Sequence, residues 1–260
     1  MITRAELQSC MVEVLLATAG VRALALGGSD ATGRTDEWSD LDLSVVVDDD
    51  AIEATFERVE AALLSLSPIR ARLRIPEPPW RGFSQDFYAL EDAPETLMVD
   101  LALIPVSLPA ERRMLERERH GDCQVLHDPD GMLTAVPLDR PALAERAAGH
   151  LATLRARTAL FAHMPQKALS RGHLADAVTA YQGFVLRPLI DVLRLRHAPE
   201  RYDFGARYLD RDLPAEVGAR LDRLCLPGDR EQLAAAIAEG RGWLAEELAA
   251  FDAGDWSVAL

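Results

Sequence analysis

Three aspartates of this chain could together hold a metal ion. Asp40 and Asp42 are separated by one residue, and the apolar run 41–47 indicates a strand. Because side chains alternate between the two faces of a strand, both carboxylates point to the same face. Like charges at that spacing repel, and magnesium, which prefers carboxylate oxygens together with substrate phosphates, is the natural cation to compensate them. Asp100, inside the apolar run 97–104, completes the site if its strand lies next to the first one.

A short segment with two glycines precedes the aspartates and could hold phosphate groups. The apolar run 21–26 predicts a strand, and it ends at Gly27, Gly28 and Ser29. Glycine lets the backbone approach a ligand closely, and Ser29 offers a hydroxyl and an amide at the expected start of a helix. We therefore expect Gly28 and Ser29 to bind the outer phosphates of a nucleoside triphosphate.

The order of these residues resembles that of the nucleotidyltransferase superfamily, which includes the kanamycin, streptomycin and lincosamide nucleotidyltransferases. The family pattern is an apolar strand, Gly-Ser or Gly-Gly-Ser, a loop, Asp-x-Asp, and a later carboxylate on a strand. The resemblance covers residues 20–106. Asp30 departs from it, since relatives often carry a basic residue there. Five residues match the pattern one for one: Gly28, Ser29, Asp40, Asp42 and Asp100.

The resemblance implies both a fold and a reaction. The fold is an α/β nucleotidyltransferase domain with a small mixed β-sheet, followed by an all-α helical domain. Asp40, Asp42 and Asp100 would bind two magnesium ions, and a nucleoside monophosphate, with AMP preferred, would pass from a nucleoside triphosphate to an acceptor hydroxyl with release of pyrophosphate. Asp100 is the third metal ligand, the general base, or both; Asp191, from the helical half, is a competing base.

The first half of the chain alternates between helix and strand patterns. Thr3 and Glu6 have the spacing of a capping box. In 69–75 apolar residues alternate with Arg70, Arg72 and Arg74, which predicts a half-buried strand whose arginines either face the triphosphate or pair with the surplus carboxylates. The predicted helices lie at about 3–19, 50–66 and 109–119, and the predicted strands at 21–26, 41–47, 69–75, 82–90, 96–106 and 124–127.

Beyond residue 131 the pattern predicts helices alone. Asp139 is the expected cap of a helix that runs to Phe161, and Pro188 is expected to kink a second helix, over 174–192. Two further helices are expected at about 214–224 and 229–251. This segregation suggests two domains: a nucleotidyltransferase catalytic domain, 1–131, and a helical substrate-binding domain, 132–260.

Charge and composition exclude several function classes. The net charge is −14, of which residues 1–110 carry −11. This negative electrostatic field disfavours a nucleic-acid partner and favours a cationic small molecule. Lys167 is the chain's one lysine and follows no glycine-rich loop, which excludes P-loop and protein-kinase chemistry. Three widely spaced cysteines, no membrane-spanning run and no signal peptide favour a cytoplasmic protein.

Two hypotheses from different classes follow. The first is a magnesium-dependent enzyme that transfers a nucleoside monophosphate to a small-molecule hydroxyl, with an aminoglycoside-like antibiotic as the acceptor that the acidic charge favours. The alternative is a non-catalytic nucleotidyltransferase-like partner, either one half of a toxin–antitoxin pair or a nucleotide sensor. A protein or tRNA acceptor is a third interpretation, and the charge makes tRNA the least favourable one.

Overall fold

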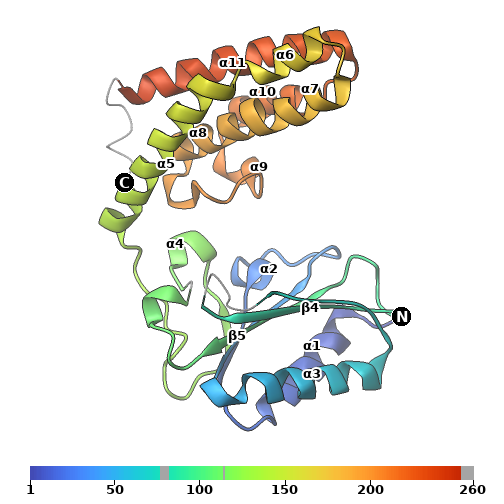
Figure 1. Ribbon diagram of the computed structural model, residues 1–260. Helices are drawn as coiled ribbons and strands as arrows, with labels where there is room; N and C mark the ends of the chain where they lie inside the picture. Colours follow the sequence, from blue (N-terminus) through green and yellow to red (C-terminus); the bar gives the residue numbers. More distant parts are fainter. Residues whose placement is uncertain (77–81, 114, 253–260) are drawn as a thin grey trace. The chain divides into compact units, whose positions relative to one another are not determined.

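The computed structural model describes residues 1–76, 82–113 and 115–252. The chain forms two compact units, Met1–Leu138 and Asp139–Leu260 (Figure 1). The division lies at Leu138 rather than at the expected residue 131, because Leu133 is buried in a core of the first unit. Which unit binds an acceptor stays a prediction.

The first unit contains a six-stranded mixed sheet. Its strand order is β3-β4-β5-β2-β1-β6, and β2 and β5 pair in parallel while the other neighbours are antiparallel. This sheet, followed by a helical unit, confirms the expected fold class. The strands are β1 (Val21–Leu26), β2 (Leu41–Val47), β3 (Ile69–Arg74), β4 (Ser84–Leu90), β5 (Val99–Pro105) and β6 (Gln124–His127).

Helices α1 (Arg4–Leu16) and α3 (Ile52–Leu66) lie on one face of this sheet (Figure 1). The capping box is present: Glu6 N donates to Thr3 Oγ1 at 3.2 Å, and Thr3 N donates to Glu6 Oε2 at 2.8 Å. α1 ends earlier than the expected residue 19, because the chain turns at Gly20, whose φ is +87°. The helices and strands share a core that includes Leu7, Met11, Leu15, Phe56, Val59, Leu63, Leu41, Leu43, Val45, Val99, Leu101 and Leu103.

A second core covers part of the opposite face of the sheet. Val46 and Ile104, near the ends of β2 and β5, pack there with Phe83, Leu108 and Leu133. Asp42 and Asp100 lie near the starts of the same two strands and also point to this face, because their neighbours in sequence are buried under the helices.

The expected helix over 109–119 was wrong. The described residues form a 3₁₀ turn, Ala110–Arg112, and a single helical turn, α4 (Arg117–His120). Between them Glu116 forms a β-bridge with Val136, and Arg113 donates hydrogen bonds to three loop carbonyls. Long-range contacts therefore replace the local helical pattern.

Strand β3 has the opposite orientation to the one expected from its pattern. Two of its three arginines face α3: Arg72 pairs with Glu60, Arg74 pairs with Glu53, and the Arg74 guanidinium lies 3.7 Å from the centre of the Phe56 ring. Leu73 is 60% exposed on the other face. The prediction of which face of β3 is buried was therefore wrong. Of the two roles considered for the arginines, the ion pairs with Glu60 and Glu53 support pairing with carboxylates.

The second unit is helical. Asp139 caps α5, as expected, by accepting a hydrogen bond from Ala142 N at 2.9 Å. The kink expected at Pro188 is a π-helical turn over Gln182–Leu186, directly before it. No described helix has the length and apolar character needed to cross a membrane. The helices are α5 (Arg140–Phe161), α6 (Met164–Ser170), α7 (Leu174–Tyr181), α8 (Arg187–His197), α9 (Leu209–Asp212), α10 (Ala215–Cys225) and α11 (Arg230–Asp252).

Candidate active site

Asp42 and Asp100 lie side by side in the sheet. The strands β2 and β5 pair in parallel, and their register places Asp42 directly opposite Asp100. Neighbouring strands are about 4.8 Å apart, and register partners project from the same face. The condition under which the two carboxylates would converge, that their strands be neighbours, is therefore met.

The electrostatics of Asp42 reflect its acidic surroundings. The pKa of Asp42 is raised to about 6, first by burial and then by the nearby charges of Asp100, Asp40 and Asp30, whereas the charge of Arg4 lowers it. Each of these carboxylates makes it harder for Asp42 to ionise. A bound cation would reverse the effect, because it favours the ionised form of every carboxylate around it.

Asp40 lies immediately before β2 and is held through its backbone. Arg4 donates two hydrogen bonds to the carbonyl oxygen of Asp40, from Nε at 3.1 Å and from Nη2 at 3.0 Å. Burial raises the pKa of the Asp40 carboxyl, while a backbone hydrogen bond from Met98 and the charge of Arg4 lower it. Asp40 thus joins the same acidic group, at the entrance to the strand that carries Asp42.

Gly28 lies directly against the carboxylate of Asp42. It begins the one-turn helix α2 (Gly28–Ala31) with φ of +52°, and a Cβ atom at this position would lie 1.9 Å from Asp42 Oδ2. Only glycine combines this backbone conformation with this contact. The preceding Gly27 donates its N–H to the carbonyl oxygen of Asp42 at 3.0 Å. The glycine turn therefore contacts both the backbone and the side chain of Asp42.

The hydroxyl of Ser29 has no hydrogen-bond partner although it is buried. No described residue accepts from or donates to its Oγ atom. Buried polar groups are normally satisfied, so an orphaned hydroxyl next to the Gly28–Asp42 contact is suited to take a ligand oxygen as its partner. This observation fits the phosphate contact predicted from the sequence, which stays a prediction.

Two residues that support the aspartates were missed by the sequence analysis. Arg4 Nη2 donates to Asp30 Oδ2 at 2.5 Å in addition to its contacts with Asp40, so one guanidinium joins α1, α2 and the start of β2. Gln85 Nε2 donates to Asp100 Oδ1 at 2.6 Å from the neighbouring strand β4. The pair with Arg4 also gives the acidic residue at position 30, where relatives often carry a basic one, a structural role in this chain.

The donor chemistry at this site suits magnesium, although no preformed metal site is evident. Among the described residues, no group of three or more His, Cys, Asp or Glu side chains has the arrangement of a metal site. Asp42 and Asp100 are nevertheless adjacent in register, and the pKa of Asp42 is raised by burial and by its acidic neighbours. Carboxylate oxygens of this kind are the usual protein ligands of Mg²⁺ when phosphates complete the coordination.

Asp191, the competing base, lies in the helical unit on α8. Arg187 Nε donates to Asp191 Oδ1 at 3.1 Å, and His150 Nε2 lies 3.4 Å from Oδ2. Asp191 is 8% exposed. It therefore already takes part in an ion pair within its own unit, whereas Asp100 lies beside Asp42.

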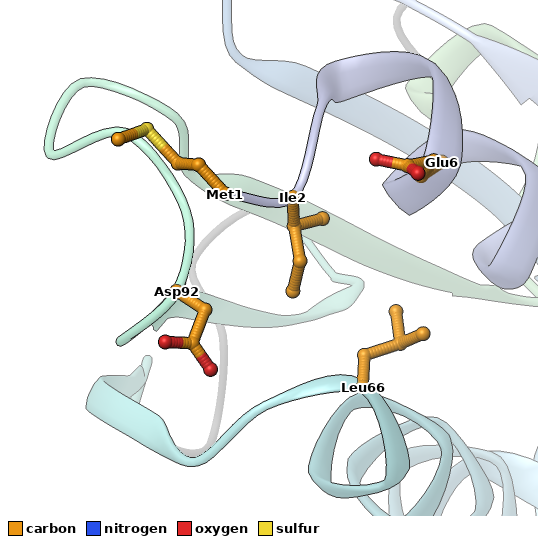
Figure 2. A pocket seen from close by; sticks show the side chains of 5 residues that line it. All are labelled: Met1, Ile2, Glu6, Leu66 and Asp92. Atoms are coloured by element: carbon orange, nitrogen blue, oxygen red, sulfur yellow. The ribbon is translucent and has the colours of Figure 1, made fainter.

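A pocket of about 320 Å³ lies elsewhere in the first unit. Figure 2 shows the five side chains that line it: Met1, Ile2, Glu6, Leu66 and Asp92. None of the predicted site residues is among them. We therefore place the candidate active site at the carboxylate pair on the sheet and not in this pocket.

The comparison with family models supports the resemblance seen in the sequence. Residues 11–94 match the model described as nucleotidyltransferase domain. The matched segment contains Gly28, Ser29, Asp40 and Asp42, and it ends before Asp100. A comparison with curated protein sequences gives no match.

Three solved structures are similar to nearly the whole chain at low identity. An aminoglycoside 6-adenyltransferase from Bacillus subtilis is 14% identical over 96% of this chain and 92% of that chain, with a TM-score of 0.35. A nucleotidyltransferase-like protein from Exiguobacterium sibiricum is 15% identical over 94% of this chain and 73% of that chain, with a TM-score of 0.37. A spectinomycin adenyltransferase from Enterococcus faecialis, determined with ATP and spectinomycin, is 12% identical over 95% and 99%, with a TM-score of 0.38. All three TM-scores are below 0.5, so the similarity is remote and fixes neither nucleotide nor acceptor.

Proposed function

The chain carries a nucleotidyltransferase domain, matched over residues 11–94, and from this premise we propose that it transfers AMP from ATP to a hydroxyl group of a cationic small molecule. The observation that carries the proposal is the pairing of Asp42 with Asp100 in register, with Gly28 against Asp42. Two adjacent carboxylates beside a glycine turn are suited to a nucleotide whose phosphates arrive with a divalent cation.

The nucleotide would bind at the Gly28 side of the site. Because Gly28 has no Cβ atom, it does not cover the Asp42 carboxylate. The hydroxyl of Ser29, which has no hydrogen-bond partner among the described residues, would bind a phosphate oxygen. We propose that both residues orient the outer phosphates of the triphosphate. Arg4 would hold the turn and the start of β2 in place through Asp30 and the Asp40 carbonyl.

Asp40, Asp42 and Asp100 are the residues that would hold magnesium. When bound, Mg²⁺ supplies charge stabilisation to the triphosphate and lowers the pKa of the acceptor hydroxyl. The raised pKa of Asp42 supports this assignment, since the acidic group gains from a cation. The protein's part is to keep the carboxylates on one face of two neighbouring strands.

Asp100 is the proposed proton acceptor. The acceptor hydroxyl oxygen forms a bond to the α-phosphorus, the bond from that phosphorus to the bridging oxygen breaks, and pyrophosphate leaves with the electron pair. The hydroxyl proton goes to the Asp100 carboxylate, which Gln85 holds by a hydrogen bond of 2.6 Å. We prefer Asp100 to Asp191 because Asp100 is the register partner of Asp42 and Asp191 pairs with Arg187.

The acceptor class follows from charge. Residues 1–110 carry a net charge of −11, which raises the local concentration of cations around the carboxylates. We propose a cationic molecule with several hydroxyl groups, such as an aminoglycoside-like antibiotic.

The test is a transfer assay with a mass readout. The purified protein is incubated with magnesium, each nucleoside triphosphate in turn, and a panel of hydroxylated antibiotics and metabolites. We expect one nucleoside monophosphate to be added to a cationic acceptor, with ATP as the preferred donor. Transfer only to neutral or anionic acceptors would contradict the acceptor class. The absence of any transfer, with a small protein co-purifying in equal amount, would instead favour the non-catalytic alternative.

A further inference from the structure

A row of four side chains crosses the sheet and begins at the candidate active site. Asp42 is the register partner of Asp100, Asp100 is the partner of Phe87 on β4, and Phe87 is the partner of Leu73 on β3. Register partners project from the same face, so all four side chains lie on the face opposite α1 and α3. The row therefore passes from two carboxylates to an aromatic ring and then to an aliphatic side chain.

The apolar end of this row is open. Leu73 is 60% exposed, and Phe87 is half-buried. On one side their neighbours on the same face are small, since Ala71 pairs with Ala89 two residues further along the two strands. On the other side along β4 lies Gln85, which donates to Asp100.

The orientation of β3 makes this exposure notable. The alternating pattern of β3 allows Ala71 and Leu73 to pack under α3 and the arginines to face solvent, yet from Ala71 onward the strand does the reverse. Ile69, before the register shift, packs against the core under the helices. Arg72 and Arg74 face α3 and pair with Glu60 and Glu53. Apolar side chains are kept on the face that carries the carboxylates, although exposed apolar surface is unfavourable in the absence of a ligand.

The two ends of the row differ in what they can bind. Gly28 and Ser29 lie at the Asp42 end, where the nucleotide phosphates are proposed to bind. Phe87 and Leu73 lie beyond Asp100, the proposed proton acceptor, so a molecule resting on them presents a hydroxyl to Asp100 from the side away from Gly28. The spacing from Asp100 to Leu73 is two strand intervals, roughly 10 Å, which is enough for one or two saturated rings.

We propose that Phe87 and Leu73 form an acceptor platform, on which the apolar C–H face of a saturated polyhydroxylated ring lies while one of its hydroxyl groups reaches Asp100. Apolar and aromatic side chains beside a few polar groups are the usual composition of small-molecule sites. The inference rests on the proposed transfer to a hydroxyl and adds the two residues that select a ring-shaped acceptor.

The test uses the full chain and the acceptor that gives the highest turnover in a panel of aminocyclitols, amino sugars and open-chain amino alcohols. Phe87→Ala and Leu73→Ser are compared with Leu64→Ser, a control at a leucine of similar exposure, 53%, on α3. We expect the KM for the acceptor to rise about tenfold in Phe87→Ala and less in Leu73→Ser, with an unchanged KM for the nucleotide. Phe87→Leu, which keeps an apolar side chain and guards against misfolding, is expected to recover part of the loss.

The outcomes separate this inference from the proposed function. Transfer by the wild-type protein with an unchanged acceptor KM in Phe87→Ala and Leu73→Ser would overturn the platform alone. Preference for open-chain amino alcohols over ring acceptors would also overturn it. Absence of transfer to any acceptor by the wild-type protein would overturn the proposed function and the platform with it.

Discussion

Gly28 and Asp42 are so close that a Cβ atom on Gly28 would lie 1.9 Å from Asp42 Oδ2. A methyl group at this position must displace the carboxylate, and the φ of +52° is itself unfavourable for alanine. The neighbouring Gly27 is different, since its Cβ atom would make an ordinary contact of 3.7 Å with Asp42 Cβ. The two glycines therefore provide a matched pair of variants.

We predict that Gly28→Ala lowers turnover at least about hundredfold by moving the Asp42 carboxylate, whereas Gly27→Ala stays within a few-fold of wild type. Steady-state kinetics of pyrophosphate release measure both variants, and thermal unfolding checks that Gly28→Ala is folded. Equal turnover in the two variants would mean that the position of Asp42 does not limit the reaction.

Gln85 is predicted to position Asp100. Gln85→Leu removes the donor that lies 2.6 Å from Asp100 Oδ1, and loss of that hydrogen bond makes the carboxylate harder to ionise. The acid limb of the pH profile of kcat should move to higher pH, with kcat lowered about tenfold at neutral pH and the KM for the nucleotide unchanged. Gln124→Leu, at an exposed position of β6, is the control. A lowered kcat with an unmoved acid limb would show that Gln85 acts in another way.

The acidic site is predicted to cost stability. Because the pKa of Asp42 is raised to about 6 in the folded protein from its ordinary value of 3.8, the folded state binds the proton more tightly than the unfolded state. Stability should therefore fall as the pH rises from about 4 to about 6. Asp42→Asn should be more stable than wild type by about 1 to 2 kcal/mol at pH 7, after allowance for solvent screening, and should lose this advantage near pH 4.

Denaturant unfolding at these two pH values, with and without magnesium, measures this effect. Magnesium should stabilise the wild-type protein at pH 7 and have less effect on Asp42→Asn, because the cation offsets the repulsion that the substitution removes. A variant less stable than wild type at pH 7 would contradict the electrostatic account of the site.

Arg4 is predicted to matter more for stability than Arg22, an arginine of the first unit whose ion pair is more exposed. Its guanidinium contacts the Asp30 carboxylate and the Asp40 carbonyl in a half-buried setting. Arg4→Ala should lower the free energy of unfolding by about 2 kcal/mol, since hydrogen bonds to charged groups are lost. Arg22→Ala, which breaks the more exposed pair with Asp48, should cost less than about 1 kcal/mol. Similar losses in both variants would show that the Arg4 contacts add no more than a surface ion pair.

Local patterns in the sequence were sufficient for much of the site. The β-branched run after Asp40 predicted β2, and the alternation of side chains along it predicted that Leu41, Leu43 and Val45 point into the core, away from Asp42. The capping residues Thr3 and Asp139 predicted the starts of α1 and α5, because a cap depends only on residues within one turn.

The rest depends on contacts between segments far apart in the chain. The register that puts Asp100 beside Asp42 is decided by strand pairing, and Gln85 reaches Asp100 only because β4 is the next strand in the sheet. The orientation of β3 depends on Glu53 and Glu60 of α3, which pair with its arginines and leave Leu73 exposed. No periodicity within a single segment contains this information.

The most direct test of the carboxylate pair is magnesium-dependent pyrophosphate release by Asp42→Asn and Asp100→Asn. The control is Asp48→Asn, a carboxylate just beyond the other end of β2 that pairs with Arg22. We predict that both site variants lose at least about hundredfold in turnover while remaining folded, and that Asp48→Asn stays within about twofold of wild type. Turnover close to that of wild type in Asp42→Asn would contradict the assignment of this site.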